Sequence, residues 1–148
     1  MSEYNEDAYR QARKDYIPTP CPFERALLSL CVGCSRARKL NLAEREAITC
    51  GDAAVQPCCR TLYEALHDNA RFALKAQQGV VWPFGKEIRA QCGGLRGLAA
   101  VMGGDGGYVD DAAGVVLAAI ERHGEIAALP YPEIMRGVVH YQPRQRRR

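Results

Sequence analysis

The chain has 148 residues, the length of one ordinary domain, and 47% of them are hydrophobic, which suffices for a core. No apolar run approaches the roughly 18–20 residues of a membrane helix, and the polar, acidic start at residues 1–7 is unlike a secretory signal. We therefore expect a single domain over residues 1–143 in the cytoplasm, where thiols stay reduced.

The formal net charge of +3 is concentrated at the C-terminal end, where four of the last five residues are arginines: Arg144, Arg146, Arg147 and Arg148. Without these four charges the remaining chain carries −1. A nearly neutral body argues against a nucleic-acid platform. Residues 144–148 are expected to be a disordered basic tail, either simply solvated or in weak contact with a nucleic acid, an acidic partner, phosphate or a membrane surface.

The first third of the chain predicts two helices with a break between them. Residues 6–16 are polar and weakly amphipathic, and the prolines within 17–22 exclude a helix there. Pro22 suits the first position of a new helix, and Gly33 is a plausible end for it.

Two more helices are predicted in the next segment. Asn41 followed by Glu44 resembles a capping box, which favours a helix that ends near Gly51. Pro57 then begins a longer helix that extends to about Ala76, because apolar residues recur along one of its faces.

The last part of the chain also reads as helical. Residues 86–102 contain three glycines that predict two short helices or a close backbone approach. Asp111 precedes a predicted helix over 112–123, and Pro132 begins a final helix to about Tyr141. The predicted fold class is therefore all-α: a compact bundle of about six to seven short helices, with cysteines at helix ends forming a metal site.

Cysteine is concentrated in one window. Six of the seven cysteines fall within the 39 residues from Cys21 to Cys59, a density of about 15%, above the roughly 8–10% typical of cysteine-built scaffolds. Disulfides fit poorly with a reducing compartment, an odd count and a chain this long. Ordinary burial explains single cysteines but not the cluster, so the pattern favours metal binding.

Helix geometry selects four of the cysteines as ligands. Each lies at a predicted helix end or in an adjoining loop, where side chains of separate helices can converge. Cys59 shares the apolar face of its helix, whereas Cys58 points about 100° away. The predicted ligands are Cys21, Cys34, Cys50 and Cys59, with Cys31, Cys58 and Cys92 as alternatives.

The identity of the metal is less constrained than the ligand set. The spacing of the four cysteines, with 12, 15 and 8 intervening residues, differs from the ferredoxin run. Cys31, Cys34 and Cys50 match three-quarters of a zinc-ribbon pattern, but the second C-x-x-C is missing. Widely spaced thiolates without a neighbouring histidine favour an iron–sulfur cluster, [4Fe-4S] foremost, with zinc as the alternative.

Two further groups bear on this site. Cys92, before Gly93 and Gly94, is either a fifth sulfur near the cluster or part of a tightly packed helix. Three basic residues directly follow Cys34 and either offset the negative charge of a cluster or face water: Arg36, Arg38 and Lys39.

Three segments carry a resemblance to known sequences: Cys21-Pro22-Phe23-Glu24, Leu42-Ala43-Glu44-Arg45-Glu46 and Gln91-Cys92-Gly93-Gly94-Leu95. Over about residues 21–100 the chain resembles a group of small proteobacterial cysteine-rich proteins. The resemblance implies a bacterial origin and no particular activity.

The functional expectation is an iron–sulfur protein for electron transfer or redox sensing that acts through a protein partner, with the cluster supplying the chemistry. The alternative is a zinc-stabilised helical interaction or regulatory module without a redox role. No Ser-His-Asp or Cys-His arrangement stands out, so the expectation leans away from an enzyme and names no catalytic residue. The sequence does not indicate an oligomeric state.

Overall fold

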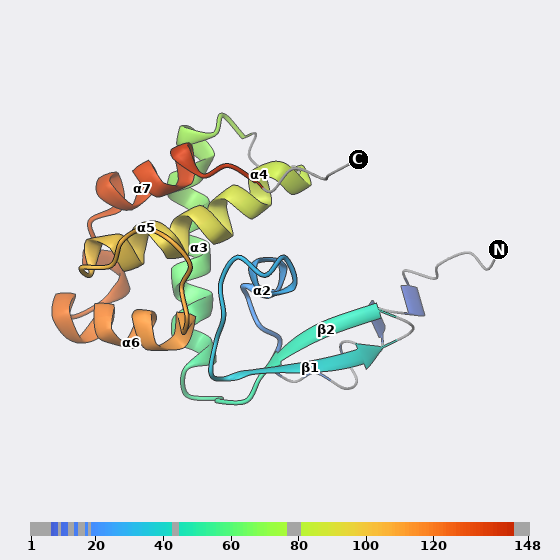
Figure 1. Cartoon of the computed structure of the whole chain (residues 1–148). Coiled ribbons are helices and arrows are strands. Elements are labelled where there is room, and N and C mark those ends of the chain that lie inside the picture. The colour runs from blue at the N-terminus through green and yellow to red at the C-terminus, as the bar shows by residue number, and fades with distance from the viewer. Residues whose placement is uncertain are drawn as a thin grey trace.

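The computed structural model describes residues 7, 8, 10, 11, 14, 17, 19–42, 45–76 and 81–143. Figure 1 shows a group of helices around a long central helix, α3, with a two-stranded hairpin at one side. The elements in chain order are α2 (Glu24–Leu28), β1 (Ala37–Leu42), β2 (Arg45–Cys50), α3 (Gln56–Ala73), α4 (Phe84–Ile88), the π-helix η1 (Arg89–Gly93), α5 (Gly94–Val101), α6 (Ala112–His123), the 3₁₀ turn η2 (Ile126–Ala128) and α7 (Tyr131–His140).

The all-α prediction is wrong, because β1 and β2 form an antiparallel hairpin where a helix from Asn41 to Gly51 was expected. The register pairs Ala37 with Cys50 and Leu42 with Arg45. Strong helix formers in the middle of this segment gave the helical pattern. Strand pairing prevails because it buries Ala47 and Ile48 in the interior.

The extended segment before α2 lies alongside β2. The Cys50 N–H donates to the Thr19 carbonyl at 2.8 Å, and the Cys21 N–H donates to the Ile48 carbonyl at 3.1 Å. The Glu24 carboxylate, in the first turn of α2, accepts the Ile48 N–H at 2.7 Å. These bonds fix α2 and the residues that precede it against the hairpin.

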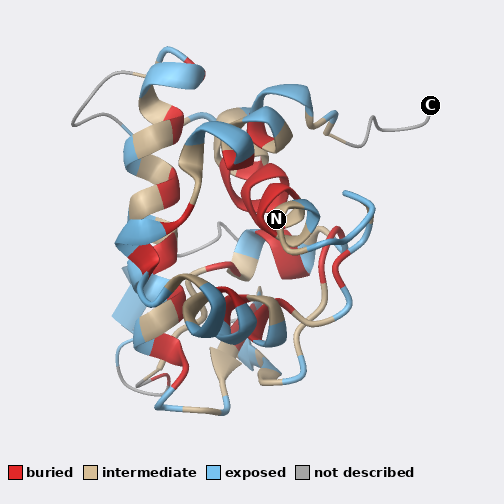
Figure 2. Cartoon of the chain, turned by 90° about the vertical axis from the view of Figure 1, so that its left-hand side faces the viewer, coloured by how far each residue is buried: buried red, intermediate tan, exposed pale blue. Residues whose placement is uncertain are grey.

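The helix predicted after Pro57 is present as α3, which contributes one face to the core. Its buried face consists of Cys59, Leu62, Leu66 and Ala70, and Figure 2 shows such buried residues facing the interior between the helices. These buried residues recur every three or four positions, so α3 buries one side against α6, α7 and η1.

The glycine-rich segment 86–102 forms α4 and α5 with the π-helix η1 between them, in agreement with two predicted short helices. The reason for the glycines is close packing against α7. A β-carbon at Gly93 would lie 2.6 Å from the Gly137 carbonyl oxygen, and one at Gly97 would lie 2.5 Å from that of Ile134. Only glycine allows the two backbones this approach.

The later helices agree with prediction. The predicted span 112–123 is α6, preceded by Asp111, and the last predicted helix is α7, which begins one residue earlier than Pro132. Most of the predicted helix at 6–16 and the whole basic tail at 144–148 lie outside the described residues. Among the helices of the described ranges, none is both long and apolar enough to cross a membrane.

The close packing of α5 on α7 leads to a stability prediction. Gly97→Ala places a methyl group against the Ile134 carbonyl, so we expect a loss of about 2–3 kcal/mol in the free energy of unfolding, measured by urea denaturation. Gly85→Ala in α4 is the matched control, because nothing lies within 4 Å of its added β-carbon. That change should be neutral or stabilising by up to about 1 kcal/mol. Equal effects of the two substitutions would contradict the packing account.

Candidate functional site

Four cysteines from four separate segments line one small cavity. Cys21 precedes α2, Cys34 lies in the loop before β1, Cys50 ends β2, and Cys59 is in the first turn of α3. The remaining wall is mostly apolar and includes Phe23, Leu27, Ala37, Val55, Ala112 and Ala113. The cavity measures about 20 Å³, which is room for about one water molecule.

Backbone pairing brings three of these cysteines together. The bonds between residues 19–21 and β2 place Cys21 beside the end of β2, where Cys50 lies. Ala37 is the register partner of Cys50, and its N–H donates to the Cys34 carbonyl at 3.3 Å. The hairpin therefore carries Cys34 and Cys50 on neighbouring chain segments.

Asp52 directs the fourth cysteine toward the same cavity by fixing the start of α3. Its carboxylate accepts the Ala54 N–H at 3.0 Å and the Arg36 Nε–H at 3.1 Å. The bond from the Ala54 N–H is the main cause that lowers the pKa of Asp52. Cys59 follows in the first turn, with its N–H donating to the Val55 carbonyl at 3.1 Å.

Burial makes two of these thiols weak acids. Loss of solvation, reinforced by the neighbouring cysteines, raises the pKa of both Cys21 and Cys59 to about 12. At neutral pH both side chains are therefore neutral thiols in the metal-free protein. A bound cation reverses this preference, because a coordinating thiol is deprotonated.

The polar contacts of the other two sulfurs come from the backbone. The Arg36 N–H donates to the Cys34 sulfur at 3.4 Å. The Cys50 thiol donates to the Asp52 carbonyl at 3.3 Å. Both sulfurs are half-buried at the edge of the cavity.

The prediction that cysteines at helix ends form a metal site is wrong. Among the described residues, no three His, Cys, Asp or Glu side chains come close enough together to hold one metal ion. A zinc ion requires sulfurs about 3.8 Å apart, because each Zn–S bond is about 2.3 Å in a tetrahedron. In addition, Cys34 lies in a loop and Cys50 in a strand, so only Cys21 and Cys59 adjoin helices.

The expectation that the chain has no disulfide is also wrong, because Cys31 and Cys92 form one. Both are buried, with exposed fractions of 5% and 0%. The bond joins the segment after α2 to η1, and Arg96 donates to the Cys31 carbonyl at 2.9 Å. Neither cysteine lines the cavity. Cys92 is therefore not a fifth sulfur beside the cavity but part of a tightly packed helix, the other of the two expectations.

The remaining alternative ligand, Cys58, is half-buried and lies outside the cavity wall. Its sulfur is 3.9 Å from the Ala54 carbonyl oxygen in the preceding turn. The 100° separation between neighbouring helical residues accounts for the difference from Cys59.

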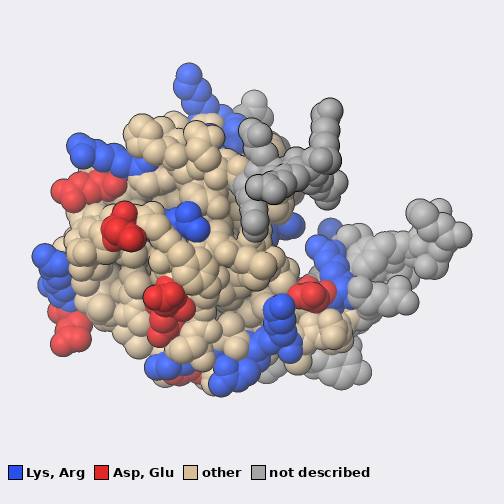
Figure 3. All heavy atoms as spheres, viewed as in Figure 1, with Lys and Arg blue, Asp and Glu red and all other residues tan. Residues whose placement is uncertain are grey.

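The three predicted near-site cations lie on or beside β1, and Figure 3 shows lysine and arginine side chains along that edge of the molecule. Arg36 pairs with Asp52, and Lys39 pairs with Glu46 at 3.4 Å. Arg38 donates to the Ala37 carbonyl at 2.9 Å. Of the three, Arg36 is tied most directly to the cysteine cavity, because its backbone contacts the Cys34 sulfur.

The sequence reading missed a polar cluster centred on Glu87. Its Oε2 accepts the Tyr63 hydroxyl at 3.1 Å and the Gln91 amide at 2.6 Å, and lies 3.0 Å from His67 Nε2. The His67 ring stacks on Trp82 with centroids 4.2 Å apart. The only sequence signal is the spacing of Tyr63 and His67, and of Glu87 and Gln91, one helical turn apart on two different helices.

Hydrogen bonding keeps Glu87 ionised in this cluster. Burial by itself disfavours the carboxylate, but the bonds from His67 and Gln91 outweigh that effect, so the pKa of Glu87 is lowered. The same burial, with Glu87 beside it, raises the pKa of Tyr63.

No family model, curated protein or solved structure matches this chain.

The raised thiol pKa values predict alkaline destabilisation of the metal-free, reduced protein. A group that binds its proton more tightly in the folded state stabilises the fold below its unfolded pKa, about 9, and this stability is lost as pH rises toward 12. Urea denaturation from pH 8 upward in the presence of a chelator measures the loss, on the order of 1 kcal/mol per pH unit per thiol.

The matched comparison is Cys59→Ala against Cys58→Ala, since tyrosines also titrate in this range. In Cys59→Ala the free energy of unfolding should fall less steeply with pH than in the wild type. In Cys58→Ala it should fall as steeply as in the wild type. The same slope in all three proteins would refute the account of buried neutral thiols.

Loss of the disulfide should be costly. Cys92→Ala opens a loop that spans 61 positions, so we expect the free energy of unfolding to fall by about 4 kcal/mol. Peptide mapping without reductant should first recover Cys31 and Cys92 in one linked pair. If both thiols are instead alkylated in the native protein, the assignment of this disulfide fails.

Proposed function

We propose that the chain binds an iron–sulfur cluster, of the [4Fe-4S] type, through Cys21, Cys34, Cys50 and Cys59. The observation that supports this proposal is the position of these four side chains, from four separate segments, on the wall of one apolar cavity. Four cysteine thiolates are the usual ligand set of such clusters. A chain that used cysteine only as a small apolar residue has no reason to gather four at one point.

A cluster and a single ion place different demands on the four cysteines. A cluster distributes its four thiolates over several iron atoms and so needs them farther apart than one zinc ion does. The cavity is smaller than a cluster, so binding requires outward movement of its walls; three of the four cysteines, Cys21, Cys34 and Cys50, are half-buried.

The surroundings of the cavity suit a negatively charged group. The Arg36 N–H already points to the Cys34 sulfur, and hydrogen bonds to cluster sulfurs are one way in which proteins set a cluster's potential. The Arg36 guanidinium remains nearby, paired with Asp52. The apolar wall supplies the low dielectric that also tunes such centres.

The proposed role is electron transfer or redox sensing through a protein partner in the cytoplasm. The cluster supplies one-electron chemistry, and the protein supplies ligands, an apolar wall and a surface for the partner. The Cys31–Cys92 disulfide is compatible with this location because burial of both sulfurs restricts access by cellular thiols.

The second candidate is a zinc-stabilised interaction module without redox chemistry. The small volume of the cavity favours it, because one zinc ion displaces the walls less than a cluster does. It requires Cys21, Cys34, Cys50 and Cys59 to move closer together than they are.

The test is anaerobic purification of the full chain, or reconstitution with ferrous iron and sulfide, followed by iron, sulfide and zinc analysis. We expect a brown protein with iron and sulfide in equal amounts and visible absorption that is bleached by dithionite. Cys50→Ser should lower the iron content severalfold or make the bound cluster labile, because it removes one of four ligands.

Cys58→Ser is the matched control, since Cys58 neighbours a proposed ligand but does not line the cavity. It should retain iron and sulfide at the wild-type level. A colourless protein with one equivalent of zinc would favour the second candidate. A protein free of all three elements under both preparations would refute metal binding.

A further inference from the structure

A second pocket lies next to the cysteine cavity and shares Cys21 as part of its wall. It measures about 300 Å³, at the lower end of small-molecule sites. The residues that decide its chemistry come from three helices and the adjoining segments: Glu24, Arg25, Arg60, Tyr63, Glu87 and Gln91. We propose that this pocket binds a small zwitterion of the amino-acid class, with its ammonium group at Glu87 and its carboxylate at Arg25 and Arg60.

Glu87 supplies the site for the positive group. Its side chain is only 13% exposed, yet it forms part of the pocket wall. The contacts with Tyr63, His67 and Gln91 all end on Oε2, so no hydrogen bond from the described residues occupies Oε1, which can accept one from a ligand. A buried carboxylate held rigidly in this way binds an ammonium group more strongly than a mobile surface carboxylate does.

Gln91 helps to fix this carboxylate in position. Its Nε2 donates to Glu87 and its Oε1 accepts the Ala26 N–H at 3.0 Å, so both ends of the amide are engaged. Gln91 is buried, with an exposed fraction of 3%. The carboxylate is therefore connected to α2, α3 and η1 at once, and its orientation does not depend on the ligand.

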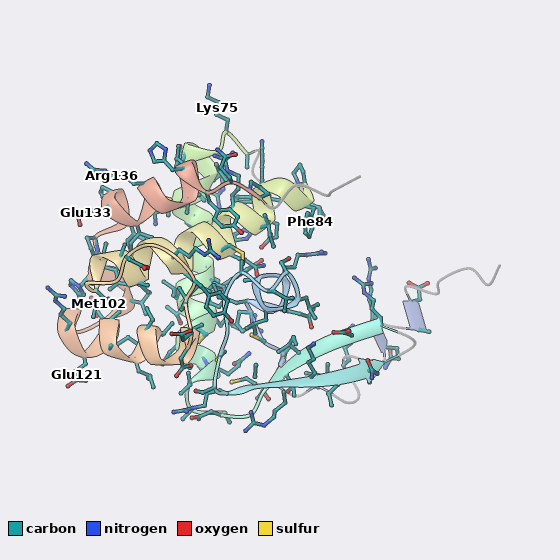
Figure 4. The ribbon with its side chains drawn as sticks, viewed as in Figure 1. Lys75, Phe84, Met102, Glu121, Glu133 and Arg136 are labelled. Atoms are coloured by element: carbon teal, nitrogen blue, oxygen red, sulfur yellow. A yellow bond between two sulfur atoms is a disulfide. The ribbon has the colours of Figure 1, made fainter. Side chains whose placement is uncertain are left out.

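Arg25 and Arg60 supply the site for the negative group. Both residues line the same pocket as Tyr63 and Glu87. The Arg25 guanidinium lies 5.5 Å from the ring centroid of Phe84, which Figure 4 shows on the side of α4 toward α2. Arginine pairs well with a carboxylate because its planar fork can donate two parallel hydrogen bonds.

The balance of charge selects a zwitterion over a simple anion or cation. Two guanidinium groups and two carboxylates line the same pocket. A simple anion is repelled by Glu87, and a simple cation is repelled by Arg25 and Arg60. A ligand with both charges satisfies both ends, and the pocket volume suits one amino acid whose side chain rests on Cys21 and Pro22.

The experiment is to titrate the full chain separately with L-valine, N-acetyl-L-valine and L-valinamide. Binding is measured by isothermal titration calorimetry and by the NMR chemical-shift changes of the backbone amides. We expect L-valine to bind and to shift the amides of Tyr63 and Gln91 most. The two derivatives, which each lack one of the charges, should bind at least about tenfold more weakly, because each loses one charge-assisted contact.

Substitutions identify the pocket independently of these derivatives. Glu87→Gln and Arg60→Gln should each weaken L-valine binding by about tenfold, whereas Glu64→Gln, an exposed change on the same helix as Arg60, should leave it unchanged. Because Glu87→Gln disturbs a buried network, Arg60→Gln at an exposed position tests the same pocket without that risk to folding.

Absence of binding at tens of millimolar L-valine, or equal binding of the acetylated and free amino acids, would overturn the proposal. Shifts confined to residues away from Tyr63 and Gln91 would do the same. Metal-free and iron-loaded protein should give the same order of affinities, because the charged groups of the pocket are not proposed cluster ligands. The result therefore does not depend on whether the cluster proposal holds.

Discussion

The pairing of the segment around Cys21 with strand β2 is the constraint on which the proposed site depends. Two backbone bonds, from Cys50 to Thr19 and from Cys21 to Ile48, bring together cysteines that are far apart in the sequence. Glu24 reinforces the same junction through the Ile48 N–H. Because the Cys21 segment leads directly into α2, this pairing also positions one wall of the second pocket.

The same pairing has an energetic consequence, because it buries thiols beside one another. Burial and mutual proximity make ionisation of Cys21 and Cys59 unfavourable in the absence of a cation. A metal centre relieves both effects, since it replaces the protons and compensates the charge. The same arrangement that makes the metal-free thiols weak acids is thus the one that benefits most from a bound cluster.

The four cysteines that the sequence selects as ligands line one cavity, but two of the elements that carry them differ from the predicted helix ends. Cys59 was identified from the periodicity of α3, which local helix geometry determines. The sequence predicts Cys50 at a helix end, but it lies on a strand, because pairing with Ala37 outweighs the helical propensity of the preceding residues. The Cys31–Cys92 disulfide and the cluster around Glu87 join positions too distant in the sequence for local patterns to reveal.

Native mass spectrometry of the full chain, purified without oxygen, tests the central claim most directly. The account predicts a species heavier than the polypeptide by the mass of four irons and four sulfides, which Cys50→Ser depletes and Cys58→Ser retains. A polypeptide that carries a single zinc ion, or no added mass at all, would contradict it.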